Sequence, residues 1–153
     1  MSAVYDTTAD KVIVFAAKDN SPARLEGYVG TVSTSSNSVT WSSATSPGNG
    51  ETRYSTSAFD PTTGRTIVCY QDVSTNGCKF AICYINSGTL TWHTGATSNG
   101  NMISTDMFGS TTNISQFDVC SIGDSKWLYC CAPVSSEPGA FSQYAQYVKI
   151  INA

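Results

Sequence analysis

The sequence predicts an all-β protein built from three antiparallel units of about 50 residues each. Apolar residues make up 41% of the 153 residues, enough for a folded core, whereas charged residues make up only 12%. Leucine occurs only at Leu25, Leu90 and Leu128, so the chain lacks the composition of a helical bundle. The apolar runs are rich in β-branched and aromatic residues and are bounded by Gly, Pro, Asn or Ser, as in short strands joined by turns.

An internal repeat organises the chain. An aromatic residue followed by Asp occurs three times, at residues 5–6, 59–60 and 117–118, and residues 5–15 align with 59–69 without a gap. In each repeat the pair precedes a turn, a basic residue and a second strand. An Asp before a turn accepts hydrogen bonds from the N–H groups of that turn, so we expect Asp6, Asp60 and Asp118 to be structural turn anchors rather than catalytic carboxylates.

Each repeat continues with further short strands. We expect third strands at 25–32, 79–85 and 144–151, and fourth strands at 38–41 and 89–92 in the first two repeats only. The first repeat lacks most of a first strand, and the third lacks its fourth strand. The chain is therefore one all-β domain, 1–153, with units of approximately 1–53, 54–110 and 111–153.

The second repeat carries the pattern aromatic-Asp-Pro-x-x-Gly-basic-β-run-aromatic-x-Asp within residues 58–72. This pattern resembles the β-propeller-blade-like repeats of phage virion-attached proteins, such as tail-fibre and capsid-surface proteins. The resemblance covers residues 1–92 well and 115–151 loosely. It implies propeller-blade-like units and a location on the virion.

Three blades cannot close a propeller, because closure takes about four to eight. We therefore expect completion by oligomerisation, either as a ring of two or more chains or as an edge-to-edge array; the alternative is a compact β-sandwich. The apolar last strand has only Lys149 as a charge, so we expect it to lie against another polypeptide. The predicted assembly edge consists of Tyr144, Tyr147, Val148 and Ile150.

Composition excludes several partners. The formal net charge is -3 and no run of basic residues exists, so we expect no nucleic-acid partner. No segment approaches ~18 consecutive apolar residues, so we expect no membrane insertion. Residues 1–6 lack the basic and apolar regions of a classical signal peptide, so we expect any exit from the cell to use another route, such as lysis after phage assembly. The resemblance implies localisation on the virion, with secretion as the alternative.

The residues for catalysis or metal binding are missing from the sequence. His93 is the only histidine and no G-x-S-x-G motif is present, so we expect no enzyme and no catalytic residue. The six cysteines match no zinc spacing, and the loops at Asp19 and Asp72 lack a calcium-binding motif, so we expect no metal and no cofactor. The cysteines in apolar runs are expected to be buried thiols; if a disulfide forms, Cys69 and Cys83 are the expected pair.

Trp41 and Trp92 end the two fourth strands at equivalent positions. They either fill the space between units or form a carbohydrate-binding platform. The sequence thus predicts a structural phage virion component, a capsid decoration or a tail or fibre protein, that assembles with itself or with other virion proteins and could attach to host glycans. The alternative is a secreted or surface lectin-like β-propeller module.

Overall fold

The computed structural model describes residues 1–18, 23–48, 51–73, 78–93, 113–134 and 147–152, and every regular element in them is a β-strand. The all-β class and the antiparallel units predicted from the sequence are confirmed. The strands form three separate sheets in chain order, and none of the three is closed. The first sheet contains β1 (Ser2–Asp6), β2 (Lys11–Ala17), β3 (Leu25–Ser33) and β4 (Ser38–Trp41). The second contains β5 (Thr52–Asp60), β6 (Arg65–Asp72), β7 (Cys78–Asn86) and β8 (Thr89–Trp92). The third contains β9 (Asn113–Gly123), β10 (Lys126–Val134) and β11 (Tyr147–Asn152).

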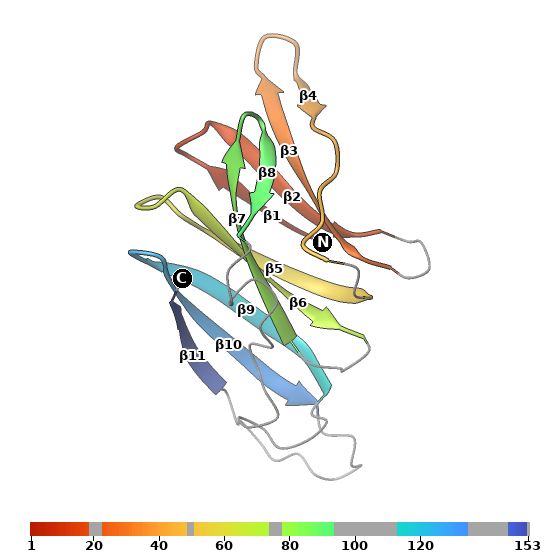
Figure 1. Cartoon of the computed structure of the whole chain (residues 1–153), viewed down its shortest axis with the longest axis vertical. Coiled ribbons are helices and arrows are strands. Elements are labelled where there is room, and N and C mark those ends of the chain that lie inside the picture. Colours follow the sequence, from red (N-terminus) through yellow and green to blue (C-terminus); the bar gives the residue numbers. More distant parts are fainter. Residues whose placement is uncertain (19–22, 49–50, 74–77, 94–112, 135–146, 153) are drawn as a thin grey trace.

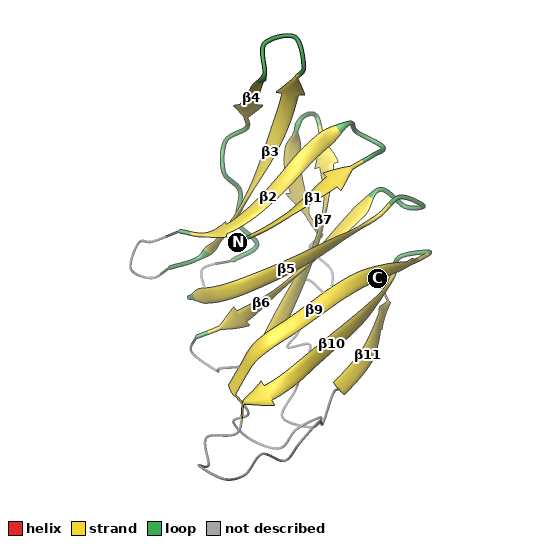
Figure 2. Cartoon of the chain, turned by 180° about the vertical axis from the view of Figure 1, so that it is seen from behind, coloured by secondary structure: helices red, strands yellow, loops and turns green. Residues whose placement is uncertain are grey.

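The three sheets follow one another along the long axis of the molecule (Figures 1 and 2). The first strand of the second sheet, β5, contacts the first strands of both neighbours, β1 and β9. The second sheet therefore lies between the other two. This order leaves one face of the first sheet and one face of the third sheet without a neighbouring sheet among the described residues.

The first two sheets share one register. Ile13 pairs with Val29 in the first sheet, as Ile67 pairs with Ile82 in the second. The fourth strands pair in the same way, with Trp41 opposite Gly30 and Trp92 opposite Cys83. We call residues equivalent when they occupy the same place in this register, counted from the first residue of each second strand: Lys11, Arg65 and Lys126.

The hairpin turns explain why the first two repeats align without a gap. Asp10 and Gly64 hold the same place in the two turns, and both have a positive φ, 57° and 67°. Glycine adopts this conformation without steric cost, and Asp tolerates it better than most residues. The turn of the third sheet is shorter: Asp124 and Ser125, both with positive φ, directly connect β9 to β10.

Three expected boundaries need correction. The first sheet has a first strand of five residues, β1, although the sequence suggested that most of it was missing. The second sheet begins at Thr52, before the expected unit boundary at 54. The third anchor is out of phase, because Asp118 pairs with Cys130 inside the hairpin and not with a residue at the turn. The residues after Asp118, where the repeat predicted a turn, continue β9 as far as Gly123, so Asp118 cannot cap the turn before Lys126.

Candidate assembly faces and a cleft at the turns

The second sheet is buried on both faces, and each face packs on a different neighbour. One side carries Val68, Ala81 and Leu90, which form a core with Ile13 and other residues of the first sheet. The other side forms a second core with residues of the third sheet; its members are Ala58, Ile67, Cys69, Phe80, Ile82, Val119, Trp127 and Tyr129. Side chains alternate between the faces of a strand, so the consecutive burial of β6 follows directly from its place between two sheets.

The outward side of the first sheet is apolar and open. It carries the alternate residues of each strand, which point away from the second sheet. Val32, Val39 and Trp41 are 48%, 42% and 48% exposed. Gly30 lies beneath Trp41, since a Cβ on Gly30 would come within 2.7 Å of the indole ring. We name this surface the first outer face; it consists of Val12, Val14, Tyr28, Gly30, Val32, Val39 and Trp41.

The same face of the second sheet is covered. Leu90 is equivalent to Val39, yet it is only 5% exposed because it packs on the first sheet. Val68 is equivalent to Val14 and is fully buried, whereas Val14 is half-buried. The first outer face therefore carries residues of the same kind as the equivalent side of the second sheet, which is buried against the first sheet.

The third sheet has a matching open side, opposite to Trp127 and Tyr129. Cys120, Leu128 and Cys130 share this side, with Leu128 paired to Cys120. Cys120 and Cys130 are exposed and Leu128 is half-buried. We name it the second outer face. Its residues are equivalent to Ala58, Ile67 and Cys69 of the second sheet, all of which are buried against the third sheet.

Trp41 and Trp92 do not form a common platform. Trp92 lies between the first two sheets, with its ring centroid 6.0 Å from that of Phe15 and its Nε1–H donated to Thr45 Oγ1 at 3.0 Å. Trp41 lies on the first outer face and is half exposed. They occupy equivalent positions, but one is covered by a sheet and the other is not. Trp92 thus has the packing role considered from the sequence, and of these two residues Trp41 is the one whose ring is exposed.

Two of the three anchors cap turns as the sequence predicted. Asp6 Oδ1 accepts the N–H groups of Thr8 and Ala9, both at 2.9 Å. Asp60 accepts the N–H of Thr62 at 3.0 Å and the hydroxyl of Thr63 at 2.7 Å.

Asp60 also connects two sheets, which the sequence did not reveal. Its Oδ2 accepts the N–H of Ser125, in the turn of the third sheet, at 2.7 Å. Burial alone would raise the pKa of Asp60, but the hydrogen bonds from Thr63, Ser125 and Thr62 outweigh it and hold the pKa below its usual value.

Asp118 has a different role from the other two. Its carboxylate accepts the hydroxyl of Thr56 in β5 at 2.7 Å, so it links the second and third sheets through a side chain. Thr56 is its equivalent in the second sheet, since Thr56 pairs with Cys69 as Asp118 pairs with Cys130. The repeated aromatic-Asp pair at 117–118 is therefore a coincidence of sequence and not a third copy of the turn.

A cleft of about 540 Å³ opens where the turns of the first two sheets meet. Its lining includes Asp6, Arg65, Tyr84 and His93, so it gathers the single histidine with a carboxylate, a guanidinium and a phenol. The corresponding place between the second and third sheets is bridged instead, by the Asp60 bond to Ser125 and by Arg65 Nη1 to Ser125 Oγ at 3.3 Å. The sequence had given no reason to bring Asp6 and His93 together.

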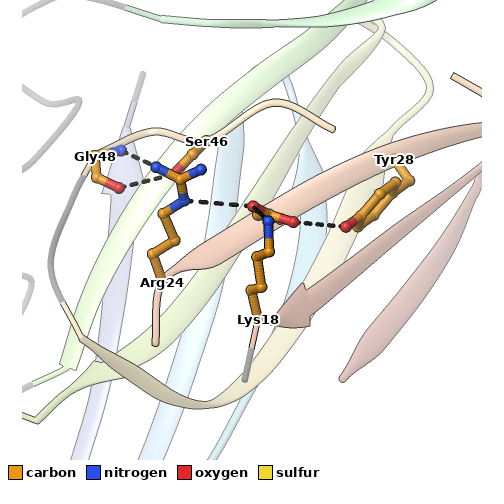
Figure 3. Close-up of polar contacts among 6 residues, drawn as sticks. Lys18, Arg24, Tyr28, Ser46 and Gly48 are labelled. Atoms are coloured by element: carbon orange, nitrogen blue, oxygen red, sulfur yellow. Dashed lines mark hydrogen bonds and ion pairs between the residues drawn. The ribbon is translucent and has the colours of Figure 1, made fainter. Parts of the chain in front are cut away.

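A buried carboxylate, that of Glu26, lies at one edge of the first outer face. Figure 3 shows Lys18, Arg24 and Tyr28 directed toward this carboxylate. Glu26 is 3% exposed, and it accepts the hydroxyl of Tyr28 at 2.6 Å. Arg24 Nε and Lys18 Nζ lie 3.3 and 3.5 Å from its Oε1. The Tyr28 bond, assisted by Lys18 and Arg24, outweighs burial and lowers the pKa of Glu26. The second sheet has an ion pair at the equivalent positions, between Lys79 and Asp72, with the acidic and the basic residue exchanged.

The cysteines are thiols wherever the structure describes their side chains. Cys69 and Cys83 are buried thiols, as the apolar runs suggested, and burial raises the pKa of the Cys83 thiol far above its usual range. They lie on opposite faces of the second sheet, so the pairing considered for them cannot form. Cys130 was also expected to be buried, but it is exposed, and none of the described sheets covers the second outer face.

The predicted assembly edge lies in β11, the last strand of the third sheet. β11 pairs only with β10 among the described strands, so its other edge has no described partner. Tyr144 lies outside the described residues, as do the side chains of Tyr147, Val148 and Ile150. The pairing of this edge with another polypeptide stays a prediction.

Within the described residues, no group of three or more His, Cys, Asp or Glu side chains could hold a metal ion. The same residues contain no helix long and apolar enough to cross a membrane. Asp19, one of the two residues considered for calcium, lies outside them. Compared with models of known families, with curated proteins and with solved structures, the chain matches none.

Proposed function

We propose that this protein is a structural assembly component whose three sheets are propeller-blade-like units and whose two outer faces bind other polypeptides. One observation carries this proposal: Val39, on the first outer face, is 42% exposed, whereas its equivalent Leu90 is 5% exposed under a neighbouring sheet. An apolar face of this kind on a soluble protein marks an interaction surface. The arrangement of the sheets supports the same role, because the first strand of the second sheet, β5, contacts the first strands of its neighbours, β1 and β9.

The particle on which it assembles follows from the sequence pattern. The repeat at residues 58–72 resembles blade repeats of phage virion-attached proteins, so we place the protein on a phage virion, as a capsid decoration or a tail or fibre component. Mass spectrometry of purified particles from the organism that encodes it tests this placement. Recovery of the protein in stoichiometric amounts with intact particles is expected, and its recovery only in the particle-free fraction would contradict a virion role.

A carbohydrate-binding module is the second candidate, and the cleft is the observation that favours it. Asp6, Arg65, Tyr84 and His93 supply hydrogen-bonding groups around a space of about 540 Å³, a combination that suits a small polar ligand such as a sugar. A glycan array distinguishes the candidates. Binding that is lost in Tyr84→Ala but retained in Trp41→Ala would favour the lectin, whereas an empty array favours assembly alone.

A further inference from the structure

We propose that a second copy of this chain occupies each outer face, bound head to tail, so that the first outer face of one copy packs on the second outer face of the other. The inference rests on the assembly function proposed above and names its partner.

The two contacts inside the chain have the same direction. The side of the first sheet that carries Ile13 packs on the side of the second sheet that carries Val68. The side of the second sheet that carries Ile67, the equivalent of Ile13, packs on the side of the third that carries Tyr129, the equivalent of Val68. Unlike sides therefore meet at both contacts, which is the definition of a heterologous interface.

The two ends of the stack are consequently of opposite kind. The first outer face is the Val68-like side, since Val14 and Val39 are equivalent to Val68 and Leu90. The second outer face is the Ile67-like side, where Leu128 is equivalent to Ile67. One end of the stack therefore exposes a Val68-like side and the other exposes an Ile67-like side, and these are the two kinds of side that pack on each other inside the chain. A symmetric contact between two first outer faces would join like sides, a contact that the chain does not use internally.

Residue character at the ends agrees with this pairing. Cys130 and its equivalent Cys69 are the same residue type; Cys69 is fully buried under the third sheet and Cys130 is exposed. The carboxylate of Glu26, at the edge of the first outer face, is already paired with Lys18 and Arg24. Covering the face would therefore not leave an uncompensated buried charge, which is the usual penalty of burying an acidic side chain.

Two copies are enough for closure. They contribute six sheets, which lies within the range of about four to eight blades in closed propellers. A closed pair covers both outer faces of both copies. A heterologous contact that did not close would leave an outer face at each end and would continue into a filament.

Complementary variants test the direction of the contact. Val39→Glu places a charge on the first outer face, and Cys130→Glu places one on the second; both positions are exposed, so the isolated fold should persist. Thr40→Glu, on the opposite side of the same strand as Val39, is the matched control for added charge, and Cys130→Ser controls for loss of the thiol. Sedimentation measures the association of each variant, and circular dichroism verifies its fold.

Head-to-tail packing predicts a specific pattern of self-association among the variants. Val39→Glu and Cys130→Glu should each weaken self-association at least about tenfold, and an equal mixture should regain it, because the mixed pair retains one unmodified contact. Both controls should associate like the wild type. The proposal is overturned if Cys130→Glu alone still pairs, if the mixture stays dissociated, or if the wild type is a folded monomer. Failure here with the protein still present on particles would leave the proposed virion function standing, since another protein would then cover the faces.

Discussion

The first and second sheets are built on the same register, yet only the second is covered on both faces. Leu90 and Val39 hold equivalent places and differ in exposure, 5% against 42%, because a sheet covers one and not the other. Trp41 and Trp92 differ in the same sense: Trp41 is 48% exposed, whereas Trp92 is partly buried against the core between the first two sheets. The first outer face therefore resembles one half of a sheet-to-sheet contact. The second sheet uses its equivalent side to pack on the first sheet, whereas no described sheet packs on the first outer face.

Truncation of the two equivalent residues should give the largest difference between the covered and the open face. Leu90→Ala should lower the free energy of unfolding by about 2–4 kcal/mol, because it leaves a cavity between two sheets. Val39→Ala should change the unfolding of the separated chain by less than about 1 kcal/mol and act instead on association. Chemical denaturation at several protein concentrations separates the effects. Equal, concentration-independent losses would show that the two faces are not different in kind.

The turn anchors give the next largest difference. Asp60→Ala should cost about 2–3 kcal/mol, because the charged carboxylate accepts bonds from Thr62, Thr63 and Ser125 and holds two sheets together. Asp6→Ala removes the hydrogen bonds that Thr8 and Ala9 donate within its own turn and should cost about 1 kcal/mol. Urea denaturation of the two variants provides the comparison. A larger loss for Asp6 would mean that the sheet-to-sheet bond at Ser125 contributes nothing.

Two glycines of β3 test the covered and the open side of one sheet. A Cβ at Gly27 would meet Leu90 Cδ1 at 2.5 Å, in a buried contact that has no room to move. Gly27→Ala should therefore destabilise by about 1–3 kcal/mol. A Cβ at Gly30 would meet the Trp41 ring at 2.7 Å, but Trp41 is 48% exposed and can shift. Gly30→Ala should thus cost less, and thermal unfolding of the two variants should show Gly27→Ala melting earlier.

The smallest expected effect is on the stability of the protein at acidic pH. The pKa of Glu26 is lowered on folding, so its stabilising contribution is present above the ordinary value of 4.5 and is lost as the pH falls through the lower folded pKa. Glu26→Gln should remove part of the loss of stability between neutral and acidic pH. The measurement is the free energy of unfolding at a series of pH values. If the variant and the wild type lose stability in parallel below the ordinary pKa, the buried cluster at Tyr28 does not hold Glu26 ionised.

The sequence predicted local structure well where the repeat was strong. The fourth strands at 38–41 and 89–92 have the expected bounds, and the positive φ of Gly64 agrees with the turn expected from the sequence. Both result from short-range signals, namely a polar turn before an alternating run and a glycine where left-handed backbone is needed. The same signals misplaced Asp118, because an aromatic residue followed by Asp also occurs inside a strand.

Burial and contacts between sheets could not be predicted in the same way. Val14 and Val68 are the same residue type at equivalent positions, and only the packing of the sheets makes one half-buried and the other fully buried. The Asp60 bond to Ser125 joins residues far apart in the chain, and the cleft gathers Asp6 with His93 across two sheets. Such juxtapositions depend on how the sheets stack, and no spacing in a single sequence encodes that.

The mass of the native protein in dilute solution decides whether a second copy covers the outer faces. Analytical ultracentrifugation over a range of concentrations should find a species of twice the chain mass of 16.3 kDa, with no larger series, because two copies cover all four outer faces. A folded species of 16.3 kDa at every concentration would contradict the account, since the first outer face would then be a stable water-exposed surface.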